Sequence, residues 1–375
     1  SDVTIEPADY VETISVNIYH ANIKSGSVRF SDWNRKGTSF SLENSTLDNV
    51  RVEGDAVKGS VNIKNNNFNN NSSFRCAYCN YHVPGKGEFI ATGNKFNQNS
   101  ELYIRGNTKF KKVTINDNEF NQNSYGLRLR LGNDWSWSNN KENKGYEVLR
   151  NKFTKAYRGI EVKYGKYVIN DNIFIESPGI VYEGYYESHK FEIKGNFFSK
   201  LKGDYAISNK RIWSGKGDQA TITDNMFCSS SKVALRISAD PNSNIVAGKN
   251  YWNTTDKTHI KNYMIYDHFN DLNIKHNITF GVHAKEQAPW LTSSQIEGCS
   301  AEQVEPETLQ ECTIGGTIYE NTTLDNSCSA YNMISDYQIP KGITLTVDPD
   351  VTINGNNKKI KIEGELKING APERL

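Results

Sequence analysis

The stretch VTINDNEFNQNSYGLRLRL, residues 113–131, decides the fold. Its two ends alternate apolar and polar residues, which is the pattern of a β-strand with one buried face. Between these ends a run of asparagines surrounds Phe120, and Gly126 precedes Arg128 and Arg130. Neither a helix nor an ordinary hairpin has this composition, so the middle of the stretch predicts a bend between two strands.

The same local pattern recurs along most of the chain: an apolar residue, two further residues, Asn, any residue and an aromatic residue. Its asparagines are Asn66, Asn94, Asn118, Asn151, Asn172, Asn196, Asn225 and Asn250. A second strand-like segment follows each Asn closely, as in RGIEVKY at 158–164 and VALRIS at 233–238. Repetition with a period in the twenties indicates a solenoid. The apolar spacing of two excludes helical repeats, and the leucine spacing of leucine-rich repeats is missing.

Such units, stacked in parallel, predict a β-helix in which the backbone of each coil pairs with the coils on either side. The recurrent Asn is expected to adopt the left-handed conformation at a sharp corner. Its amide can donate to one neighbouring coil and accept from the other, which predicts a structural Asn ladder. The aromatic residue two positions later is expected to point inward and to stack on its equivalents.

The composition is compatible with a thin solenoid core. The chain has 375 residues, of which 36% are hydrophobic, and it contains 20 Tyr and 16 Phe; the mean hydropathy is −0.67. The formal net charge is +1, so no global field favours nucleic acid or a membrane surface. The sequence also has no apolar run long enough to span a bilayer, which predicts no membrane insertion.

The six cysteines favour disulfides over a metal site. They are Cys76, Cys79, Cys228, Cys299, Cys312 and Cys328. Only CAYC at 76–79 has the spacing of a zinc half-site, so no metal is expected. The three cysteines at 299–328 suggest local disulfides and an oxidising, extracytoplasmic location. Cys228 could equally be a buried free thiol, and the sequence leaves the connectivity open.

The N-x-F pattern followed by G-I-x-V, over residues 15–290, resembles the right-handed parallel β-helix repeat of the pectin-lyase-like superfamily. The similarity is to the repeat class of bacterial secreted and surface proteins, and residues 250–280 resemble the closing turn of such modules. This resemblance implies an all-β, right-handed parallel β-helix over residues 1–290, with roughly 9 to 11 coils. It says little about activity, because one fold hosts many functions.

The end of the chain resembles the opening coils of another such module, through GITLTVDP at 342–349 and GELKING at 364–370. We therefore expect a cysteine-containing linker at 291–332 and a β segment at 333–375. This segment either caps the first solenoid or begins a further module of a tandem array. Tandem arrays are typical of secreted or surface scaffolds, and the protein is otherwise expected to be monomeric.

Outward residues of the second strands predict two columns of side chains on one face. The first column is predicted as Arg75, Tyr103, Arg128, Glu161, Val181, Ala206 and Arg236. The second is predicted as Ala77, Arg105, Arg130, Lys163, Glu183, Ser208 and Ser238. Stacked coils lie about 4.8 Å apart, so these columns form a basic stripe. Either its charges pair along the stack, as Arg130 and Glu161 would, or the stripe is a groove for an extended polymer.

Long polar loops beside this face are rich in aromatic residues, which suit the faces of sugars. Guanidinium groups bind carboxylate or sulfate with two hydrogen bonds. Together these features predict binding of an acidic polysaccharide or glycan, for adhesion or substrate capture, and not of nucleic acid. The predicted ligand-binding residues are Arg105, Arg128, Arg130, Trp135, Trp137, Lys163, Tyr182, Tyr185, Tyr186, Arg211, Trp213 and Arg236.

Enzymatic activity is left open by the sequence. The family resemblance implies, for a lyase, a Lys or Arg base beside a uronate carboxylate, with a bound cation such as calcium and an acid such as Tyr182 or His189; otherwise no cofactor is expected. A hydrolase needs two carboxylates. The catalytic candidates are Arg128, Arg130, Lys163, Glu161, Glu183 and His189. The characteristic motifs of polygalacturonases and mannuronan epimerases are missing, so a spacer without ligand is a third possibility.

Overall fold

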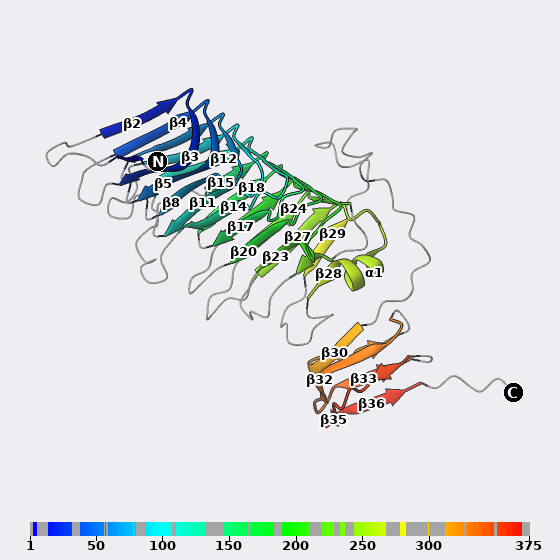
Figure 1. Cartoon of the computed structure of the whole chain (residues 1–375). Helices are drawn as coiled ribbons and strands as arrows, with labels where there is room; N and C mark the ends of the chain where they lie inside the picture. Colours follow the sequence, from blue (N-terminus) through cyan, green and yellow to red (C-terminus); the bar gives the residue numbers. More distant parts are fainter. Residues whose placement is uncertain are drawn as a thin grey trace.

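The structure, a computed structural model, confirms the predicted all-β fold: 63% of the described residues are strand and 3% are helix, and the parallel sheets form a solenoid of about 10 turns (Figure 1). Each coil contributes a strand to each of three faces, which are named here in the order in which the chain meets them. The structure describes residues 3–5, 14–31, 38–55, 57, 59–77, 79, 87–106, 110–131, 146–163, 165–183, 190–209, 219–228, 233–236, 244–267, 278–282, 299, 312–325, 328–348 and 351–369.

The first face is an 11-stranded parallel sheet. Its strands alternate between buried and solvent-facing residues, as in Lys112–Asn116, because only one side of the sheet meets the core. The strands are β2 (Ile14–Tyr19), β4 (Thr38–Glu43), β6 (Val61–Lys64), β9 (Glu88–Thr92), β12 (Lys112–Asn116), β15 (Tyr146–Leu149), β18 (Lys166–Asn170), β21 (Lys190–Lys194), β24 (Gln219–Thr223), β27 (Asn244–Asn250) and β29 (Thr279–Val282).

The second face consists of short strands that follow the recurrent Asn. These strands are β7 (Asn67–Asn69), β10 (Lys95–Phe96), β13 (Glu119–Asn121), β16 (Lys152–Thr154), β19 (Ile173–Ile175), β22 (Phe197–Ser199) and β25 (Met226–Phe227). The corner between the first and second faces is called the first corner. The corner between the second and third faces is called the second corner.

The third face carries the strands that contain the predicted basic columns. These are β1 (Val3–Ile5), β8 (Ser73–Ala77), β11 (Glu101–Gly106), β14 (Gly126–Leu131), β17 (Ile160–Lys163), β20 (Ile180–Glu183), β23 (Tyr205–Asn209), β26 (Val233–Arg236) and β28 (Ile265–Tyr266). The longer strands β3 (Asn22–Ser31) and β5 (Thr46–Asp55) run through the second corner, since β5 pairs with both β7 and β8.

The predicted Asn ladder is present at the first corner, and all eight of its asparagines are completely buried. Asn118 shows the pattern: its Oδ1 accepts from the backbone N–H and the side-chain amide of Asn94, at 3.0 and 2.9 Å. Its own amide donates to Asn151 Oδ1 and to the carbonyl of Ala91. Ser45 replaces Asn at the N-terminal end of the ladder, where its N–H donates to Asn66. Each Asn from Asn66 to Asn225 therefore connects three coils, Asn250 connects the last two, and the side-chain polar atoms of all eight are paired.

The left-handed backbone conformation lies one residue earlier than the sequence predicted. The positive φ angles belong to the residues that precede the ladder, including Asn65, Asp117, Arg150 and Asp171, and not to the ladder asparagines. The ladder asparagines are thus selected for their hydrogen bonds. The preceding residue makes the turn. At position 150 this residue is an arginine, which does not favour the left-handed conformation.

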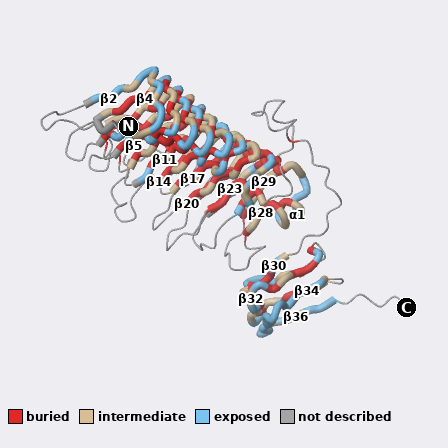
Figure 2. Tube along the Cα trace, viewed as in Figure 1, coloured by how far each residue is buried: buried red, intermediate tan, exposed pale blue. Residues whose placement is uncertain are grey.

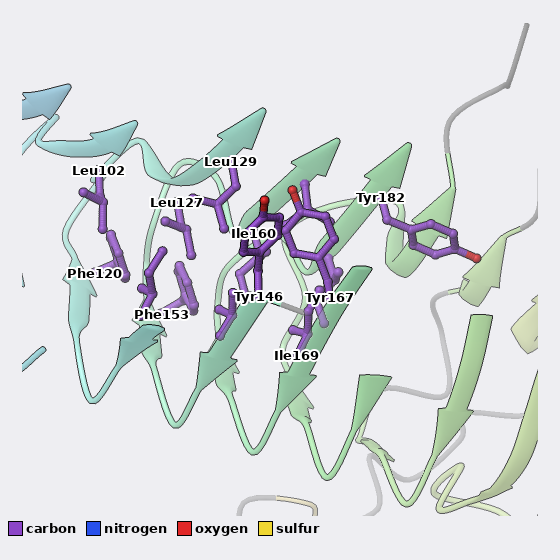
Figure 3. Close-up of a cluster of buried hydrophobic side chains, with 14 of the residues drawn as sticks. Leu102, Phe120, Leu127, Leu129, Tyr146, Phe153, Ile160, Tyr167, Ile169 and Tyr182 are labelled. Atoms are coloured by element: carbon purple, nitrogen blue, oxygen red, sulfur yellow. The ribbon is translucent and has the colours of Figure 1, made fainter. Parts of the chain in front are cut away.

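Aromatic side chains form the predicted inward column. Phe68, Phe96, Phe120, Phe153, Phe174, Phe198 and Phe227 stack coil on coil, with ring centroids 4.6 to 5.4 Å apart. Trp252 ends the column, and its indole N–H donates to the carbonyl of Gly281 at 2.9 Å. Figure 3 shows part of this core, with side chains from all three faces meeting inside the coil. The buried residues run the length of the solenoid as one cluster (Figure 2).

Gly126 sits where the second corner enters strand β14. Its φ is +68°, and a Cβ atom there would collide with the carbonyl oxygens of Arg158 and Gly159 on the next coil. Glycine meets both constraints because it has no Cβ. The glycine before the two arginines is therefore explained by close approach of the backbone, not by the arginines.

A short helical turn follows the last ladder coil. Helix α1 (Lys257–His259) continues into the π-helical turn η2 (Ile260–Met264). Asp256 caps this turn by accepting from the N–H groups of Thr258 and His259. Ile260 and Met264 are buried in the solenoid core, so the turn covers the end of the coil stack.

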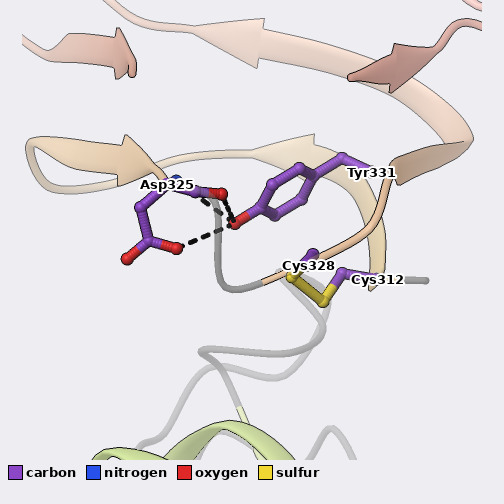
Figure 4. Close-up of a disulfide and its surroundings, with 4 residues drawn as sticks. All are labelled: Cys312, Asp325, Cys328 and Tyr331. Atoms are coloured by element: carbon purple, nitrogen blue, oxygen red, sulfur yellow. Dashed lines mark hydrogen bonds between the residues drawn. A yellow bond between two sulfur atoms is a disulfide. The ribbon is translucent and has the colours of Figure 1, made fainter. Parts of the chain in front are cut away.

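The described residues from Cys312 onward form a second parallel β unit. Its strands are β30 (Cys312–Thr317), β31 (Thr322–Leu324), β32 (Tyr331–Ile339), β33 (Thr344–Val347), β34 (Ile353–Asn354), β35 (Ile360–Ile362) and β36 (Glu365–Ile368). They pair within two small parallel sheets and enclose a core of their own. In Figure 4 the Tyr331 hydroxyl donates to the Asp325 carbonyl beside the Cys312–Cys328 disulfide.

All six cysteines form disulfides: Cys76–Cys79, Cys228–Cys299 and Cys312–Cys328. Cys228 is therefore not a free thiol. Its partner Cys299 is 71 residues away, so the disulfides of the tail are not all local. Cys299 packs with Phe197, Met226 and Tyr251 on the outer side of the second face. Three disulfides indicate an oxidising environment.

Candidate functional site

The first predicted column is present on the third face, with one correction. The register places Glu53, Arg75, Tyr103, Arg128, Glu161 and Val181 level on successive coils. Ser208, Arg236 and Tyr266 continue the column. The prediction of Ala206 in the first column and Ser208 in the second was wrong by two residues. Ile207 pairs with Ile180, because both fill core positions, and this leaves the side chain of Ala206 buried.

The second predicted column is present over five coils. Ala77, Arg105, Arg130, Lys163 and Glu183 lie level on successive coils. Ser238, which was predicted further along this column, lies outside the described residues. The structure therefore brings Arg105, Arg128, Arg130, Glu161, Lys163 and Glu183 together on strands β11, β14, β17 and β20. We call this group the basic patch.

Within the basic patch both central arginines pair with the same carboxylate. The Nε of Arg128 lies 3.3 Å from Glu161 Oε2, and a terminal nitrogen of Arg130 lies 3.5 Å from Glu161 Oε1. The guanidinium of Arg128 also lies 4.8 Å from the ring centroid of Tyr103, as a cation–π contact. One coil further on, Lys163 pairs with Glu183. The pairing that the sequence left open is thus realised.

These ion pairs do not neutralise the patch. Glu161 is 14% exposed, whereas Arg130 is 35% exposed, so the carboxylate lies deeper than the guanidinium that reaches solvent. A guanidinium has five N–H donors, and one shared carboxylate cannot use those of two arginines. The described side chains of the two columns carry a clear excess of positive charge: the cations are Arg29, Arg75, Arg105, Arg128, Arg130, Lys163 and Arg236, and the carboxylates are Glu53, Glu161 and Glu183.

Arg236 is held apart from the basic patch. Its guanidinium lies 4.8 Å from the ring centroid of Tyr205 and 5.6 Å from that of Tyr266. Val181 and Ser208 separate it from Glu161 along the column. The sequence analysis did not identify these two tyrosines. Their places beside Arg236 depend on how strands β23, β26 and β28 are aligned, and the predicted alignment of β23 was wrong by two residues. Tyr205 and Tyr266 fix the direction of an exposed arginine by stacking.

The side chain of Tyr182 does not reach the solvent side of the third face. Its side chain is 1% exposed and packs against Phe191 in the core, as Figure 3 shows. Alternation along strand β20 turns Val181 and Glu183 outward and Tyr182 inward. The remaining predicted residues lie outside the described residues: Trp135, Trp137, Tyr185, Tyr186, His189, Arg211 and Trp213.

The catalytic candidates on the described strands have no arrangement that selects a reaction. Arg128 and Arg130 both face Glu161, Lys163 faces Glu183, and arginine keeps its proton in proteins. Glu161 and Glu183 each contact a cation rather than each other. Among the described residues there is no group of three or more His, Cys, Asp or Glu that could hold a metal ion.

The second corner carries a further polar site that sequence reasoning missed. A shallow depression there is lined by Asn69, Asn97, Gln98, Asn121, Gln122, Thr154 and Lys155. The available signal was the repeated tetrapeptide NNNS at 69–72 and NQNS at 97–100 and 121–124. This repeat covers only three coils and is independent of the ladder asparagines.

No family model matches the chain, and comparisons with curated proteins and with solved structures give no match. Within the described part of the chain, no helix has the length and apolar character needed to cross a bilayer.

Proposed function

We propose that this protein is a secreted or cell-surface β-helix module that binds an acidic polysaccharide or glycan along the third face, for adhesion or substrate capture. The observation that carries the proposal is the pair Arg105 and Arg130. They lie level on adjacent coils of the second column, and both reach solvent. Arg130 is held in place by a deeper carboxylate.

The spacing of the solenoid suits an extended polymer. Level residues of adjacent coils lie about 4.8 Å apart, so the columns offer donors at regular intervals along the axis. Guanidinium groups match carboxylate and sulfate geometry with paired hydrogen bonds. Contacts to Glu161 and Tyr103 restrict Arg128 before any ligand binds, which lowers the entropy lost on binding.

The disulfides support the proposed extracytoplasmic location. The three disulfides support an extracytoplasmic module, because such bonds persist in oxidising compartments. The repeat also resembles that of pectin-lyase-like β-helices in bacterial secreted proteins, and the second β unit would suit a longer tandem scaffold. Polysaccharide is the ligand class that such a location makes accessible.

Binding and catalysis are separated by one set of assays. The protein is titrated with polygalacturonate, alginate, hyaluronan and chondroitin sulfate at 50 and 300 mM NaCl, and the same mixtures are followed for new double bonds and new reducing ends. We expect binding to at least one polymer that weakens with salt. New double bonds would indicate a lyase, and reducing ends alone a hydrolase. No salt-sensitive binding to any of the four polymers would leave a spacer and reject the proposal.

A further inference from the structure

The second corner holds a depression whose lining differs in chemistry from the basic patch. Its volume is about 540 Å³, within the range of small-ligand sites. Five of its seven lining residues are Asn or Gln, with Thr154 and Lys155 as the others, and none is acidic. The depression therefore presents amide and hydroxyl groups over several coils, with a single cation.

The floor of the depression is an amide column that is incompletely satisfied. Asn97 donates to Asn69 at 3.0 Å, and Asn121 donates to Asn97 at 3.4 Å. Thr154 lies level with Asn121 on the next coil. Its hydroxyl oxygen is covered from solvent, yet it has no hydrogen-bond partner among the described residues. A buried hydroxyl without a partner is costly, so this end of the column is less well satisfied than the Asn69–Asn97–Asn121 part.

The rim is formed by long amides in unusual backbone conformations. Gln98 and Gln122 have φ angles of 45° and 43° and are exposed. Asparagine and glycine favour this region, and the following residues Asn99 and Asn123 fit that preference. The preference does not account for glutamine. Two successive coils thus have glutamine at the rim, and its side chain extends further from the corner than that of asparagine.

An aromatic pair stands on the same corner. Tyr125 follows Gln122 by three residues, and Tyr157 lies level with it on the next coil, where its N–H donates to Ser124. The rings meet edge to face with centroids 5.6 Å apart, and Tyr157 is 61% exposed. The guanidinium of Arg158 lies 5.9 Å from the Tyr157 centroid. An aromatic ring that remains exposed on a corner is suited to stack on a ligand face.

We propose that the second corner is a separate binding site for a neutral sugar unit of a glycan. Amide groups of Gln98 and Gln122 exchange hydrogen bonds with ring hydroxyls, since an amide both donates and accepts. Tyr157, on the same corner, covers one face of the sugar. Charge plays a minor part in this site, which distinguishes it from the basic patch. The proposal does not rest on the proposed function of that patch.

The test uses the full chain with cellohexaose, xylohexaose and mannohexaose, by saturation-transfer NMR and calorimetry in 0.5 M NaCl. The first variant is Gln98→Asn with Gln122→Asn, which keeps the amides, suits the left-handed backbone and shortens their reach. The second is Tyr157→Ala. We expect binding of at least one hexasaccharide that survives the salt and weakens at least fivefold in each variant.

The control is Lys200→Asn, which changes another left-handed, exposed corner residue outside the depression. We expect it to leave the hexasaccharide affinity unchanged. If none of the three hexasaccharides binds, or if the glutamine variant and the control bind equally well, the proposal is overturned. Acidic polymers are titrated against the same variants, and their unchanged affinity would keep the two sites distinct.

Discussion

Glu161 contacts two arginines at once, and this defines the electrostatics of the basic patch. Its side chain is 14% exposed and lies next to Arg128 on one side and Arg130 on the other. A carboxylate in this place orders two cations while it cancels the charge of only one. The single residue therefore supports the fold and, at the same time, competes with any anion that approaches from solution.

The substitution Glu161→Gln should separate these two effects. Because the shared negative charge is lost, we expect acidic polysaccharide to bind about threefold more tightly, while the free energy of unfolding falls by about 1 kcal/mol. Titration and urea unfolding measure the two quantities. The matched control is Glu147→Gln, which removes an ion pair with Lys112 on the first face and should leave the affinity unchanged. Weaker polysaccharide binding by Glu161→Gln would contradict this account of the patch.

At the scale of the element, the ladder of the first corner is a continuous chain of buried amides. Asn118 accepts two hydrogen bonds from Asn94 and donates to Asn151 and Ala91. Removal of this side chain takes these hydrogen bonds from the backbone N–H of Asn94 and the carbonyl of Ala91, and it removes one of the bonds made by the Asn94 amide and by Asn151 Oδ1. A buried unsatisfied group costs about 1–3 kcal/mol, so one position of the ladder affects its neighbours as well.

We expect Asn118→Ala to lower the free energy of unfolding by about 3 kcal/mol, because several buried polar groups lose their partners together. Asn116→Ala is the control: this half-buried side chain donates only to the exposed Asp117, and its loss should cost about 0.5 kcal/mol. Urea unfolding followed by circular dichroism compares the two variants. Equal destabilisation would show that the ladder has no special energetic role.

The period of the strands and corners could be predicted from sequence because each coil needs an inward aromatic residue and a buried Asn at the first corner. Phe120 and Asn118 have equivalents on every coil between β7 and β25, so the pattern identified the core and the ladder. Positions that break the repeat were not predictable in this way. The path from the aromatic column to the core residue of the following strand is two residues longer from Phe198 to Ile207 than from Phe153 to Ile160, so Ala206 was assigned two residues out of register. The left-handed residue before each Asn also varies, from Asn65 to Arg150.

The cations of the candidate site could be predicted because they also follow a regular period. Arg105, Arg128, Arg130 and Lys163 follow from the period of two along their strands. The pairing of Arg130 with Glu161 was one of the two alternatives that the sequence offered. The contacts of Arg128 with the same carboxylate and with Tyr103 depend on distances between coils that a single sequence does not contain. The second corner was overlooked since its NQNS repeat covers few coils and resembles ordinary corner chemistry.

At the scale of the whole molecule, the Cys228–Cys299 disulfide holds Cys299, 71 residues further along the chain, against the second face. Cys299 covers Phe197, Met226 and Tyr251, which are outward-facing yet buried. Elsewhere this face presents polar residues such as Asn67 and Lys95 to solvent. The buried outer surface of the last coils therefore includes Cys299 and its disulfide.

Replacing both cysteines by serine, at 228 and 299, should expose this cluster. A disulfide that closes a long loop contributes about 2–4 kcal/mol, so we expect faster hydrogen exchange across Phe197–Phe227. The double replacement at 312 and 328 serves as control, because its disulfide belongs to the core of the second unit. If exchange across Phe197–Phe227 is unchanged in the first variant, the covering role is wrong.

The central claim, that the third face binds acidic polysaccharide, is tested most directly by one comparison of dissociation constants. Arg105→Gln with Arg130→Gln removes two cations from the basic patch, and Lys95→Gln with Lys152→Gln removes two exposed cations from the second face. Each protein is titrated with polygalacturonate, alginate, hyaluronan and chondroitin sulfate. We predict that the arginine variant loses at least tenfold in affinity, about 1.4 kcal/mol, while the lysine variant stays within about twofold of the unmodified protein. Equal losses in the two variants would contradict the claim.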